Sequence, residues 1–270
     1  MKSINQHNRE RIKNSPSYRL AYQDEEFLGS NELRPLRLQL ELLKPEMVMD
    51  AHNITSTVVI FGSARICSKE EIEKALKNAR NKKDEIEMRQ LETKLKYAHY
   101  YEEARKLTRL LGEKPIATNG DRLIVVTGGG PGIMEAANRG AYDANSQSIG
   151  LNITLDHEQE PNPYISPELC FQFQYFAIRK MHFLLRAKAL VAFPGGFGTF
   201  DELFEALTLI QTGRMPKMPV YLFSKEFWSG AVNFDFLVDS GVISREDLDL
   251  FVYMENAEDL WQHIKDYYRK

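Results

Sequence analysis

The chain has 270 residues, of which 43% are hydrophobic and 27% charged, the composition of a globular protein that can bury a sizeable core. Its formal net charge of −3 provides no overall electrostatic basis for binding nucleic acid. The first thirty residues are polar, and no apolar run approaches the roughly 20 residues of a membrane helix, so we expect a cytoplasmic chain with no membrane partner. Its two cysteines, Cys67 and Cys170, fit no metal-ligand spacing, so no metal site is predicted.

The N-terminal part differs from the remainder in composition. Residues 1–30 are rich in Asn, Arg, Lys, Gln and Glu and are interpreted as a loosely ordered arm or an extra helix used for oligomer contacts. Apolar residues at helical spacing predict a helix over 31–50, despite a proline near each end. We therefore predict an N-terminal arm and helix over 1–50, followed by a single domain over 51–270.

Residues 68–112 are densely charged and lack proline, so they predict one long helix or a helical hairpin with a solvated face and no catalytic role. Short apolar runs then alternate with helical patterns along the chain. Strands are predicted at 57–61, 123–126, 149–155, 168–173, 190–193, 220–223 and 251–254, and helices at 133–145, 176–188, 199–213, 225–238 and 257–268. This alternation predicts an α/β fold with a doubly wound, mostly parallel, Rossmann-like sheet, helices on both faces and an extra N-terminal helical arm.

Three glycine-containing loops follow predicted strands, at Gly62–Arg65, Gly128–Gly132 and Gly195–Gly198. Ligands of doubly wound sheets bind outside the carboxyl ends of the strands. Because all three loops leave carboxyl ends, we expect them to converge on one crevice.

The third loop has the arrangement of an anion site, because an apolar strand, a glycine turn and a helix start follow one another. Free N–H groups at a helix start favour phosphate, and Thr199 can cap the helix or bond a phosphate oxygen. Glu202 lies one turn further, close enough to act on whatever the phosphate anchors. The alternative is a capping box formed by Thr199 and Glu202, although a simple helix start does not need Gly195, Gly196 and Gly198 together.

The glycine loops also restrict the class of nucleotide. Ile133 stands where the dinucleotide fingerprint requires its last glycine, and neither long loop has the Gly-Lys-Ser/Thr of a P-loop. A hydride-transfer enzyme or an ATPase is therefore disfavoured, and a mononucleotide fits better. Pro131 suits the first position of the following helix, so the second loop has either a ligand role or a packing role.

The motifs resemble those of the LOG (Lonely Guy) family, the cytokinin riboside 5′-monophosphate phosphoribohydrolases often labelled lysine decarboxylases. The resemblance rests on Pro194-Gly195-Gly196-Phe197-Gly198-Thr199-x-x-Glu202, on Gly128-Gly129-Gly130-Pro131-Gly132-Ile133-Met134-Glu135, and on Arg179-Lys180. It covers roughly 57–268. Two further segments, Phe61-Gly62-Ser63-Ala64-Arg65 and Glu158-Gln159-x-Pro161-Asn162-x-Tyr164, look like the longer bacterial branch of the family.

The resemblance implies a homodimer or higher homo-oligomer that hydrolyses the N-glycosidic bond of a nucleoside 5′-monophosphate, AMP or an N6-modified AMP, without a cofactor. It implies that Arg179 and Glu202 form the catalytic pair. The candidate substrate-binding residues are Glu158, Lys180, Gly195, Gly196, Phe197, Gly198, Thr199, Asp201, Thr208, Gly129, Gly130, Met134 and Ser63. A pyridoxal phosphate enzyme is not indicated, because no lysine stands in a convincing setting for a Schiff base.

Each assignment has a simpler alternative. By spacing alone, Arg179 and Lys180 lie on a solvated helix face, Glu158 is a loop carboxylate, and Thr208 bonds to its own helix backbone. Two other functions also remain open at this stage. One is a non-catalytic protein that binds a nucleotide or carries molybdenum cofactor, and the other is a structural oligomer built on the arm and the charged helices. A carboxylate beside a phosphate gives a pure anion binder no advantage, so Glu202 favours the enzyme.

Overall fold

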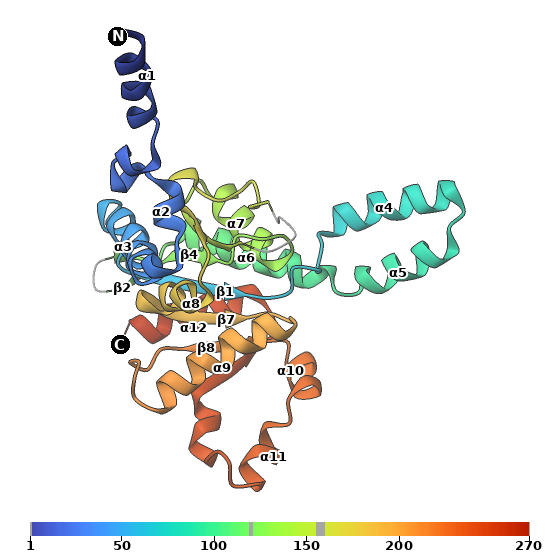
Figure 1. The fold of residues 1–270 in the computed structure, drawn as a ribbon. Coiled ribbons are helices and arrows are strands. Elements are labelled where there is room, and N and C mark those ends of the chain that lie inside the picture. Colours follow the sequence, from blue (N-terminus) through green and yellow to red (C-terminus); the bar gives the residue numbers. More distant parts are fainter. Residues whose placement is uncertain (1, 119–120, 155–159, 270) are drawn as a thin grey trace. The chain divides into compact units, whose positions relative to one another are not determined.

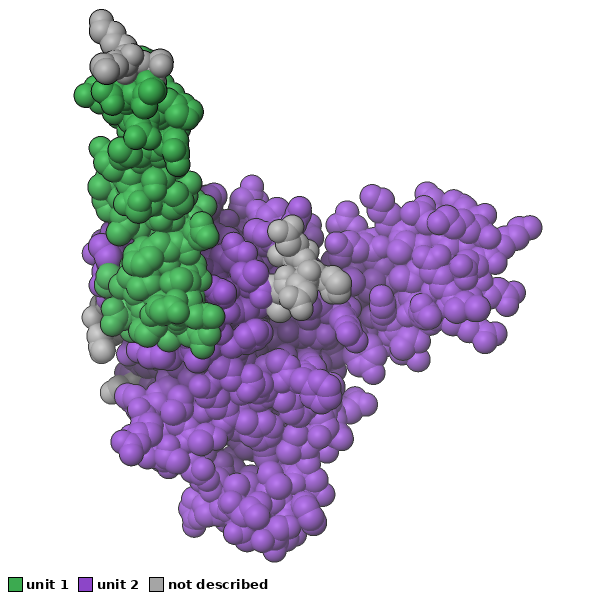
Figure 2. All heavy atoms as spheres, in the orientation of Figure 1, with its two compact units in different colours: residues 1–44 green, residues 45–270 purple. Residues whose placement is uncertain are grey.

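A computed structural model describes residues 2–118, 121–154 and 160–269. The chain divides into two compact units, residues 1–44 and residues 45–270 (Figure 2). The helix α3 (Arg34–Ala51) contributes residues to both units, and the division predicted at residue 50 stays a prediction.

The first unit is helical. It contains α1 (Lys2–Lys13), three single-turn 3-10 helices, α2 (Glu25–Gly29) and the first part of α3. The side chain of Asp24 caps α2 by accepting a hydrogen bond from the backbone N–H of Phe27 at 3.2 Å. Arg37 on α3 donates to the carbonyl oxygens of Leu28 and Ser30, each at 2.6 Å, and so satisfies acceptors at the end of α2. The predicted helical arm is confirmed, and α3 continues through Pro45.

The second unit contains a seven-stranded sheet in which every pair of neighbouring strands is parallel (Figure 1). The strand order is β6-β5-β4-β1-β7-β8-β9. The bounds are β1 (Thr57–Phe61), β4 (Ile124–Thr127), β5 (Ser148–Ile153), β6 (Cys170–Phe173), β7 (Ala187–Ala192), β8 (Val220–Phe223) and β9 (Phe251–Met254). The chain builds β4, β5 and β6 on one side of β1, and then β7, β8 and β9 on the other side. The direction of strand order therefore reverses between β1 and β7, and these two strands form the topological switch point.

The sheet is covered on both faces, as predicted. In β1, Val58 and Ile60 belong to one hydrophobic cluster, and Val59 and Phe61 belong to the other, because successive strand residues point to opposite faces. The first cluster includes residues of α6 (Ala98–Glu113), α7 (Ile133–Asp143) and α12 (Ala257–Tyr268). The second includes residues of α8 (Phe176–Leu185), α9 (Phe197–Gln211), α10 (Lys225–Ala231) and α11 (Phe234–Asp239). The doubly wound α/β prediction is therefore correct.

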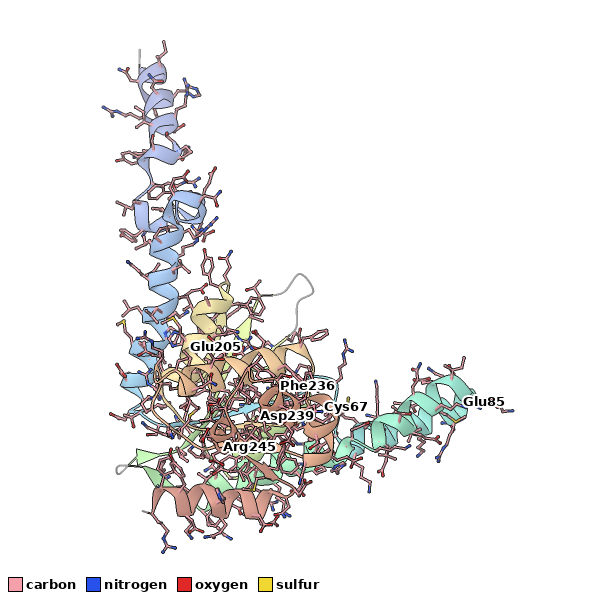
Figure 3. All side chains as sticks on the ribbon, turned by 90° about the horizontal axis from the view of Figure 1, so that it is seen from below. Cys67, Glu85, Glu205, Phe236, Asp239 and Arg245 are labelled. Atoms are coloured by element: carbon pink, nitrogen blue, oxygen red, sulfur yellow. The ribbon has the colours of Figure 1, made fainter. Side chains whose placement is uncertain are left out.

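The charged segment 68–112 forms three helices. The first two, α4 (Lys69–Lys82) and α5 (Glu85–Leu95), make a hairpin that projects from the sheet, with Cys67 at its base and Glu85 at its tip (Figures 1 and 3). Its small core contains Ile72, Leu76 and Ala98. The third helix, α6, packs on the sheet, so the predicted hairpin is confirmed for only part of the segment.

The boundary between α8 and β7 also differs from the sequence-based prediction. The predicted helix over 176–188 ends at Leu185, and β7 begins at Ala187. The side chain of Arg186, between them, donates to the carbonyl of Ile54 at 2.9 Å and pairs with Glu46 and Asp50. Pairing with β1 then recruits Ala187 and Ala189 into the strand, so tertiary contacts override the local helical preference.

A separate two-stranded antiparallel sheet, which was not predicted, joins β2 (Ala117–Thr118) to β3 (Asp121–Arg122). None of the helices within the described ranges 2–118, 121–154 and 160–269 has the length and apolar character needed to cross a bilayer.

Candidate active site

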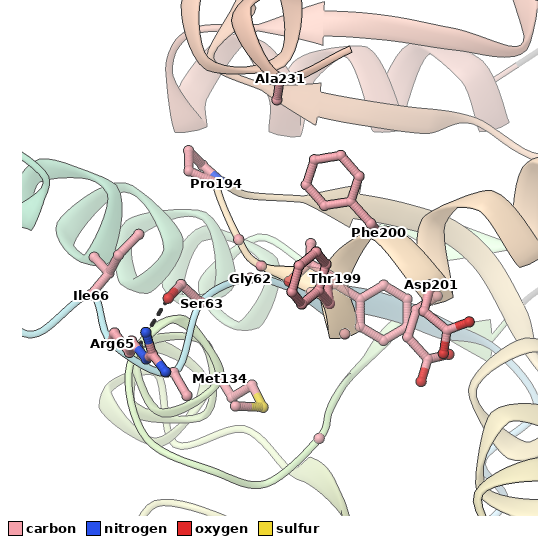
Figure 4. Close-up of a pocket in the computed structure, with 18 of the residues that line it drawn as sticks. Gly62, Ser63, Arg65, Ile66, Met134, Pro194, Thr199, Phe200, Asp201 and Ala231 are labelled. Atoms are coloured by element: carbon pink, nitrogen blue, oxygen red, sulfur yellow. Dashed lines mark hydrogen bonds between the residues drawn. The ribbon is translucent and has the colours of Figure 1, made fainter.

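The three glycine-containing loops meet at the carboxyl edge of the sheet, around a cavity of about 1010 Å³ (Figure 4). Ser63, in the loop after β1, connects them. Its backbone N–H donates to the carbonyl of Pro194 at 3.0 Å, and its own carbonyl accepts from the N–H of Ile133 at 3.1 Å. The predicted convergence of the loops on one crevice is confirmed, and the crevice lies at the topological switch point.

The lining residues surround one continuous cavity. The part around Gly128, Met134, Arg179 and Glu202 is called the β4-side lobe, because Arg179 Nη2 and Met134 Sδ both lie within 2.8 Å of the place that a β-carbon on Gly128 would take. The lining also includes Arg65, Ile66, Tyr97, Phe227 and Ala231. In Figure 4, Ile66 and Asp201 lie on opposite sides of Thr199.

The helix α9 begins at Phe197, two residues earlier than predicted. Gly196 is its N-terminal cap and has an extended backbone, without a side-chain cap. Thr199 therefore lies inside the helix, so the cap offered at Thr199 is wrong, and so is the alternative of a capping box with Glu202. A β-carbon on Gly195 would lie 2.1 Å from Thr199 Oγ1, whereas one on Gly196 or Gly198 would meet nothing within 4 Å. The turn is thus closed behind Gly195 and open toward the cavity, so the first N–H groups of α9 have room for an anion.

Glu202 lies on α9 at the wall of the β4-side lobe and is only 8% exposed. Burial raises the pKa of Glu202 from 4.5 to about 7, while the positive charges of Arg179 and Lys180 oppose that rise. A carboxyl group with such a pKa accepts and releases a proton near neutrality, which suits acid–base chemistry.

Arg179 projects from α8 toward the same lobe. Its Nε donates to the carbonyl of Leu151 on β5 at 2.7 Å, and its guanidinium lies 5.0 Å from the centre of the Phe183 ring. Burial lowers the pKa of Arg179, and the charge of Glu202 partly restores it. The side chain is therefore fixed by β5 and by its own helix, with a cation held beside the buried carboxyl group.

Gly128 makes the position of Arg179 possible. A β-carbon on Gly128 would lie 2.6 Å from Arg179 Nη2 and 2.8 Å from Met134 Sδ. Both atoms are near the ends of flexible side chains, so we expect the Gly128→Ala chain to fold with the guanidinium of Arg179 displaced. We expect kcat/KM for the hydrolysis of AMP, the substrate expected from the sequence, to fall at least ~10-fold, because small displacements of catalytic groups lower the rate strongly. Steady-state kinetics measures this loss. Gly230→Ala is the control, because its β-carbon would meet nothing within 4 Å, and an equal loss in both variants would contradict the explanation.

The cavity lining contains Arg179, Glu202 and eight of the predicted substrate-binding residues. These eight are Ser63, Met134, Gly195, Gly196, Phe197, Gly198, Thr199 and Asp201. Phe197 is 96% exposed, so its ring is available to a ligand. The roles of Arg179, Glu202 and these eight residues in binding or catalysis stay predictions. Glu158 lies outside the residues that the structure describes.

Lys180 and Thr208 instead line a shallow hollow of about 500 Å³ that shares Phe200 and Asp201 with the cavity. Lys180 Nζ lies 2.7 Å from Asp201 Oδ2 and 3.0 Å from Glu205 Oε2. Thr208 Oγ1 donates to the carbonyl of Phe204 at 2.6 Å, which is the helix-backbone bond that the sequence offered as the simpler alternative.

Gly129 and Gly130 are buried behind the cavity lining. The side-chain amide of Asn162 donates to both of their carbonyl oxygens at 3.1 Å and to Asn138 Oδ1 at 2.9 Å. Gly132 is the cap that precedes α7 and Ile133 is its first residue, so Pro131 does not stand at the first helical position as predicted. The packing interpretation of this loop therefore describes Gly129 and Gly130, and Gly128 is the member that reaches the cavity.

Sequence reasoning missed several cavity residues. Gly128 and Arg65 stand in loops that the sequence singled out, so their place at strand ends was an available signal. Tyr97 and Ala231 had none, because each comes from a helical segment that the chain brings to the cavity from far away in sequence. Within the described residues, no group of three or more His, Cys, Asp or Glu side chains has the arrangement of a metal site.

The raised pKa of Glu202 predicts an effect on stability. A carboxyl group with a raised folded-state pKa contributes stability that is complete below about pH 4.5 and is lost as pH rises through about 7. Glu202→Gln keeps the shape of the protonated form. We expect its stability to match that of the wild-type chain near pH 4.5 and to exceed it by roughly 3 kcal/mol at pH 8. Chemical denaturation at both pH values measures the difference, and equal stabilities at pH 8 would contradict the raised pKa.

Comparison with known proteins identifies relatives of this chain. A family profile described as "Possible lysine decarboxylase" matches residues 134–264. The chain is 28% identical over 175 residues to the cytokinin riboside 5′-monophosphate phosphoribohydrolase LOG2 of Arabidopsis thaliana, covering 63% of this chain and 78% of that protein. The resemblance to the LOG family is confirmed. A probable LOG phosphoribohydrolase of rice, LOGL3, is 27% identical over 153 residues, 53% of this chain and 68% of its own length.

Among solved structures, the molybdenum cofactor carrier protein of Chlamydomonas reinhardtii is 18% identical, with a TM-score of 0.48, covering 80% of this chain and 99% of that one. Of the described cavity-lining residues, the cations are Arg65 and Arg179, and none is a lysine. No described lining residue could therefore form the Schiff base of a pyridoxal phosphate enzyme, so the cavity does not support the lysine decarboxylase activity in the family description. The two residues that the LOG resemblance implies as a catalytic pair, Arg179 and Glu202, both line the cavity.

Proposed function

We propose that this chain hydrolyses the N-glycosidic bond of a nucleoside 5′-monophosphate, AMP or an N6-modified AMP, and releases the free base and ribose 5-phosphate. The observation that carries the proposal is the buried Glu202 carboxyl beside Arg179, in a lobe that adjoins the open glycine turn. The similarity to LOG phosphoribohydrolases supports the same reaction class.

The anionic end of the substrate binds at the start of α9 in this proposal. The N–H groups of Gly196, Phe197 and Gly198 have no partner within the helix, and the helix dipole favours negative charge there. The open space beside Gly196 and Gly198 accommodates phosphate oxygens. Binding energy from the phosphate then positions the ribose in the β4-side lobe.

Glu202 performs the proton transfers. Cleavage leaves positive charge on the ribose ring and an electron pair on the departing base, so a carboxylate beside the ring stabilises the transition state. Glu202 removes a proton from the attacking water as the oxygen bonds to C1′, and then passes that proton to the base nitrogen. A pKa of about 7 allows one group to act in both directions.

Arg179 holds and polarises the reacting groups. Its guanidinium is planar and permanently charged, so it binds phosphate or ribose oxygens without donating a proton. Its charge also favours the ionised form of Glu202, which is the form that activates water. Removing either residue should therefore affect the other.

The direct test incubates the purified chain with AMP, GMP, CMP, UMP and IMP, and detects released base by chromatography. Release of base together with ribose 5-phosphate in equal amounts is the expected result. Binding of AMP without any base release, by a chain whose circular dichroism shows it is folded, would instead favour a nucleotide-binding protein.

We further infer a homodimer or higher homo-oligomer in the cytoplasm. The α3 residues Leu40 and Met47 are 51% and 61% exposed, and apolar side chains on one helix are suited to a contact with a second chain. Size-exclusion chromatography with light scattering measures the molar mass of the purified protein at micromolar concentration. A molar mass equal to that of one chain would contradict this inference.

A further inference from the structure

The segment around Asn162 has no part in the reaction proposed above, although the pattern Pro161-Asn162-x-Tyr164 contributes to the LOG resemblance. In the structure, the Asn162 side chain is buried, with 7% of the residue exposed, and it contacts the loop that follows β4. A buried amide is stabilised only when its donors and acceptors are paired. The partners of Asn162 therefore indicate what this segment does.

The amide of Asn162 requires an acceptor on one side and a donor on the other. Its Oδ1 accepts from the backbone N–H of Tyr164 at 3.2 Å, a turn in which asparagine bonds the chain two residues further on. Its Nδ2 donates to the carbonyl oxygens of Gly129 and Gly130 and to Asn138 Oδ1. The backbone N–H of Asn162 adds a hydrogen bond to the carbonyl of Gly129 at 2.8 Å. The loop is therefore held by donors that an aspartate side chain lacks.

Asn138, on α7, joins this contact to the sheet. Its Nδ2 donates to Ser148 Oγ at 2.9 Å and to the carbonyl of Ile149 at 3.4 Å, both on β5. Its Oδ1 also accepts from Thr127 Oγ1, on β4, at 2.7 Å. Thr127 Oγ1 in turn accepts the N–H of Gly129 at 3.0 Å. The loop after β4 is thus tied to two strands through buried side chains, and such fully paired networks hold a backbone rigidly.

The loop held in this way supports Arg179. Gly128 directly precedes the two anchored glycines, and a β-carbon on Gly128 would lie 2.6 Å from Arg179 Nη2. On the other side of the guanidinium group, Nε donates to the carbonyl of Leu151, on β5, at 2.7 Å. Arg179 therefore has one contact to a strand and one to the loop, and the loop contact depends on the position of Gly128.

We propose that Asn162 is a positioning residue for Arg179. Its amide fixes the loop Gly128–Gly130, and the loop keeps the guanidinium group beside the carboxyl group of Glu202. Without the amide, buried carbonyl oxygens lose their donor, and the loop moves until they find other partners. Arg179 then keeps its bond to Leu151 but loses its second contact. The expected effect on catalysis rests on the proposed function, whereas the position of Arg179 can be measured without any reaction.

Asn162→Ala is expected to lower kcat/KM for AMP at least ~10-fold, because small displacements of a catalytic group lower the rate strongly. Gly128→Ala disturbs the same contact with Arg179. If the two substitutions act through one contact, the double variant loses much less than the roughly 100-fold expected for two independent losses of that size. Steady-state kinetics on the four chains measures this coupling, and a fully multiplicative loss would overturn the route through Gly128.

Asn233→Ala is the matched control. The side chain of Asn233 caps α11 by accepting from the N–H of Phe236 at 3.0 Å, and it does not line the cavity. Its removal also deletes an asparagine hydrogen bond and lowers stability, but it should leave kcat/KM unchanged. Equal losses of activity in Asn162→Ala and Asn233→Ala, with both chains folded by circular dichroism, would indicate a general structural effect and overturn the proposal.

Carbon-13 NMR titration of the Glu202 carboxyl group provides a readout that needs no reaction. The absence of its signal in Glu202→Gln assigns the resonance. The charges that act on Glu202 are those of Arg179 and Lys180, on α8, and of Asp201 and Glu205, on α9. The charge of Arg179 lowers the pKa of Glu202, so its displacement should move the titration midpoint to higher pH.

That upward shift is expected in Asn162→Ala and not in Asn233→Ala, and an unchanged midpoint in Asn162→Ala would overturn the proposal. Thr127→Val is the second variant if Asn162→Ala does not fold. Valine has a similar shape but cannot accept the N–H of Gly129, so the same upward shift is expected.

The two hypotheses fail separately. A wild-type chain that does not cleave AMP would refute the glycosidase, and the NMR titration would still decide whether Asn162 positions Arg179. Cleavage of AMP by the wild-type chain, with an unchanged Glu202 titration in the folded variant, would refute the positioning role alone.

Discussion

Glu202→Gln is expected to lower the turnover of AMP at least ~100-fold, the usual size of a combined acid–base and electrostatic contribution. The amide has the shape of the carboxyl group but neither accepts the proton of the attacking water nor carries the charge that stabilises the ribosyl cation. The phosphate contacts at Gly196–Gly198 are unaffected, so AMP affinity should stay close to that of the wild-type chain. Single-turnover kinetics and calorimetry measure the two quantities separately.

The control is Glu205→Gln, on the same helix and one turn further from the glycine loop. Glu205 pairs with Lys180 at 3.0 Å and does not line the cavity, so this variant should retain AMP turnover. The pH profile adds an independent readout. For the wild-type chain, kcat/KM should rise as pH increases through about 7, because ionised Glu202 is the working form. Undiminished base release by Glu202→Gln would remove Glu202 from the mechanism.

Arg179→Ala is expected to lower turnover at least ~100-fold and also to weaken nucleotide binding. The guanidinium reaches the cavity from α8 and is fixed by Leu151, so its loss removes a contact to the ground state as well as to the transition state. Its charge lowers the pKa of Glu202, so any residual activity should have its midpoint shifted to higher pH. The full pH dependence of kcat/KM measures that shift.

Arg179→Lys tests whether charge alone is sufficient. Lysine keeps the charge but lacks the planar fork that bonds two oxygens at once, so we expect at least ~10-fold lower kcat/KM than in the wild-type chain. Arg214→Ala, at an exposed position outside the cavity, is the matched control and should have no effect. An Arg179→Ala chain with wild-type kinetics and an unshifted pH profile would contradict the assignment.

Local sequence was sufficient wherever the physical cause is local. The strand Thr57–Phe61 was predicted within its observed bounds, because a short run of apolar and β-branched residues that ends at a glycine is typical of a strand covered on both faces. The glycine turn at Gly195–Gly198 was recognisable because three glycines in front of a helix exceed what a simple helix start needs. The structure shows a close approach only at Gly195, to Thr199, and open space beside Gly196 and Gly198. The convergence of the three loops also followed, since parallel strands place their carboxyl ends at one edge.

The start of α9 shows where local rules fail. The sequence offers Thr199 as a cap three residues before Glu202, and this pattern is typical of a capping box. In the structure α9 starts at Phe197, so Thr199 and Glu202 both lie within the helix and are both buried. The carboxyl group then acquires its raised pKa from desolvation, which is a property of the packed site and not of the motif.

The sequence by itself determined the fold class, the glycine turn and the placing of Glu202 one turn into the following helix, because these depend on residue type and short-range spacing. Spacing alone placed Arg179 on a solvated helix face, and only the resemblance to the LOG family singled it out. Only the tertiary structure decided that Arg179 enters the cavity while its neighbour Lys180 pairs with Asp201 and Glu205 on the outside. Adjacent helix residues point about 100° apart, and which direction faces the cavity depends on how α8 packs on β5. Tyr97 likewise reaches the site only because the hairpin and β8 place it there.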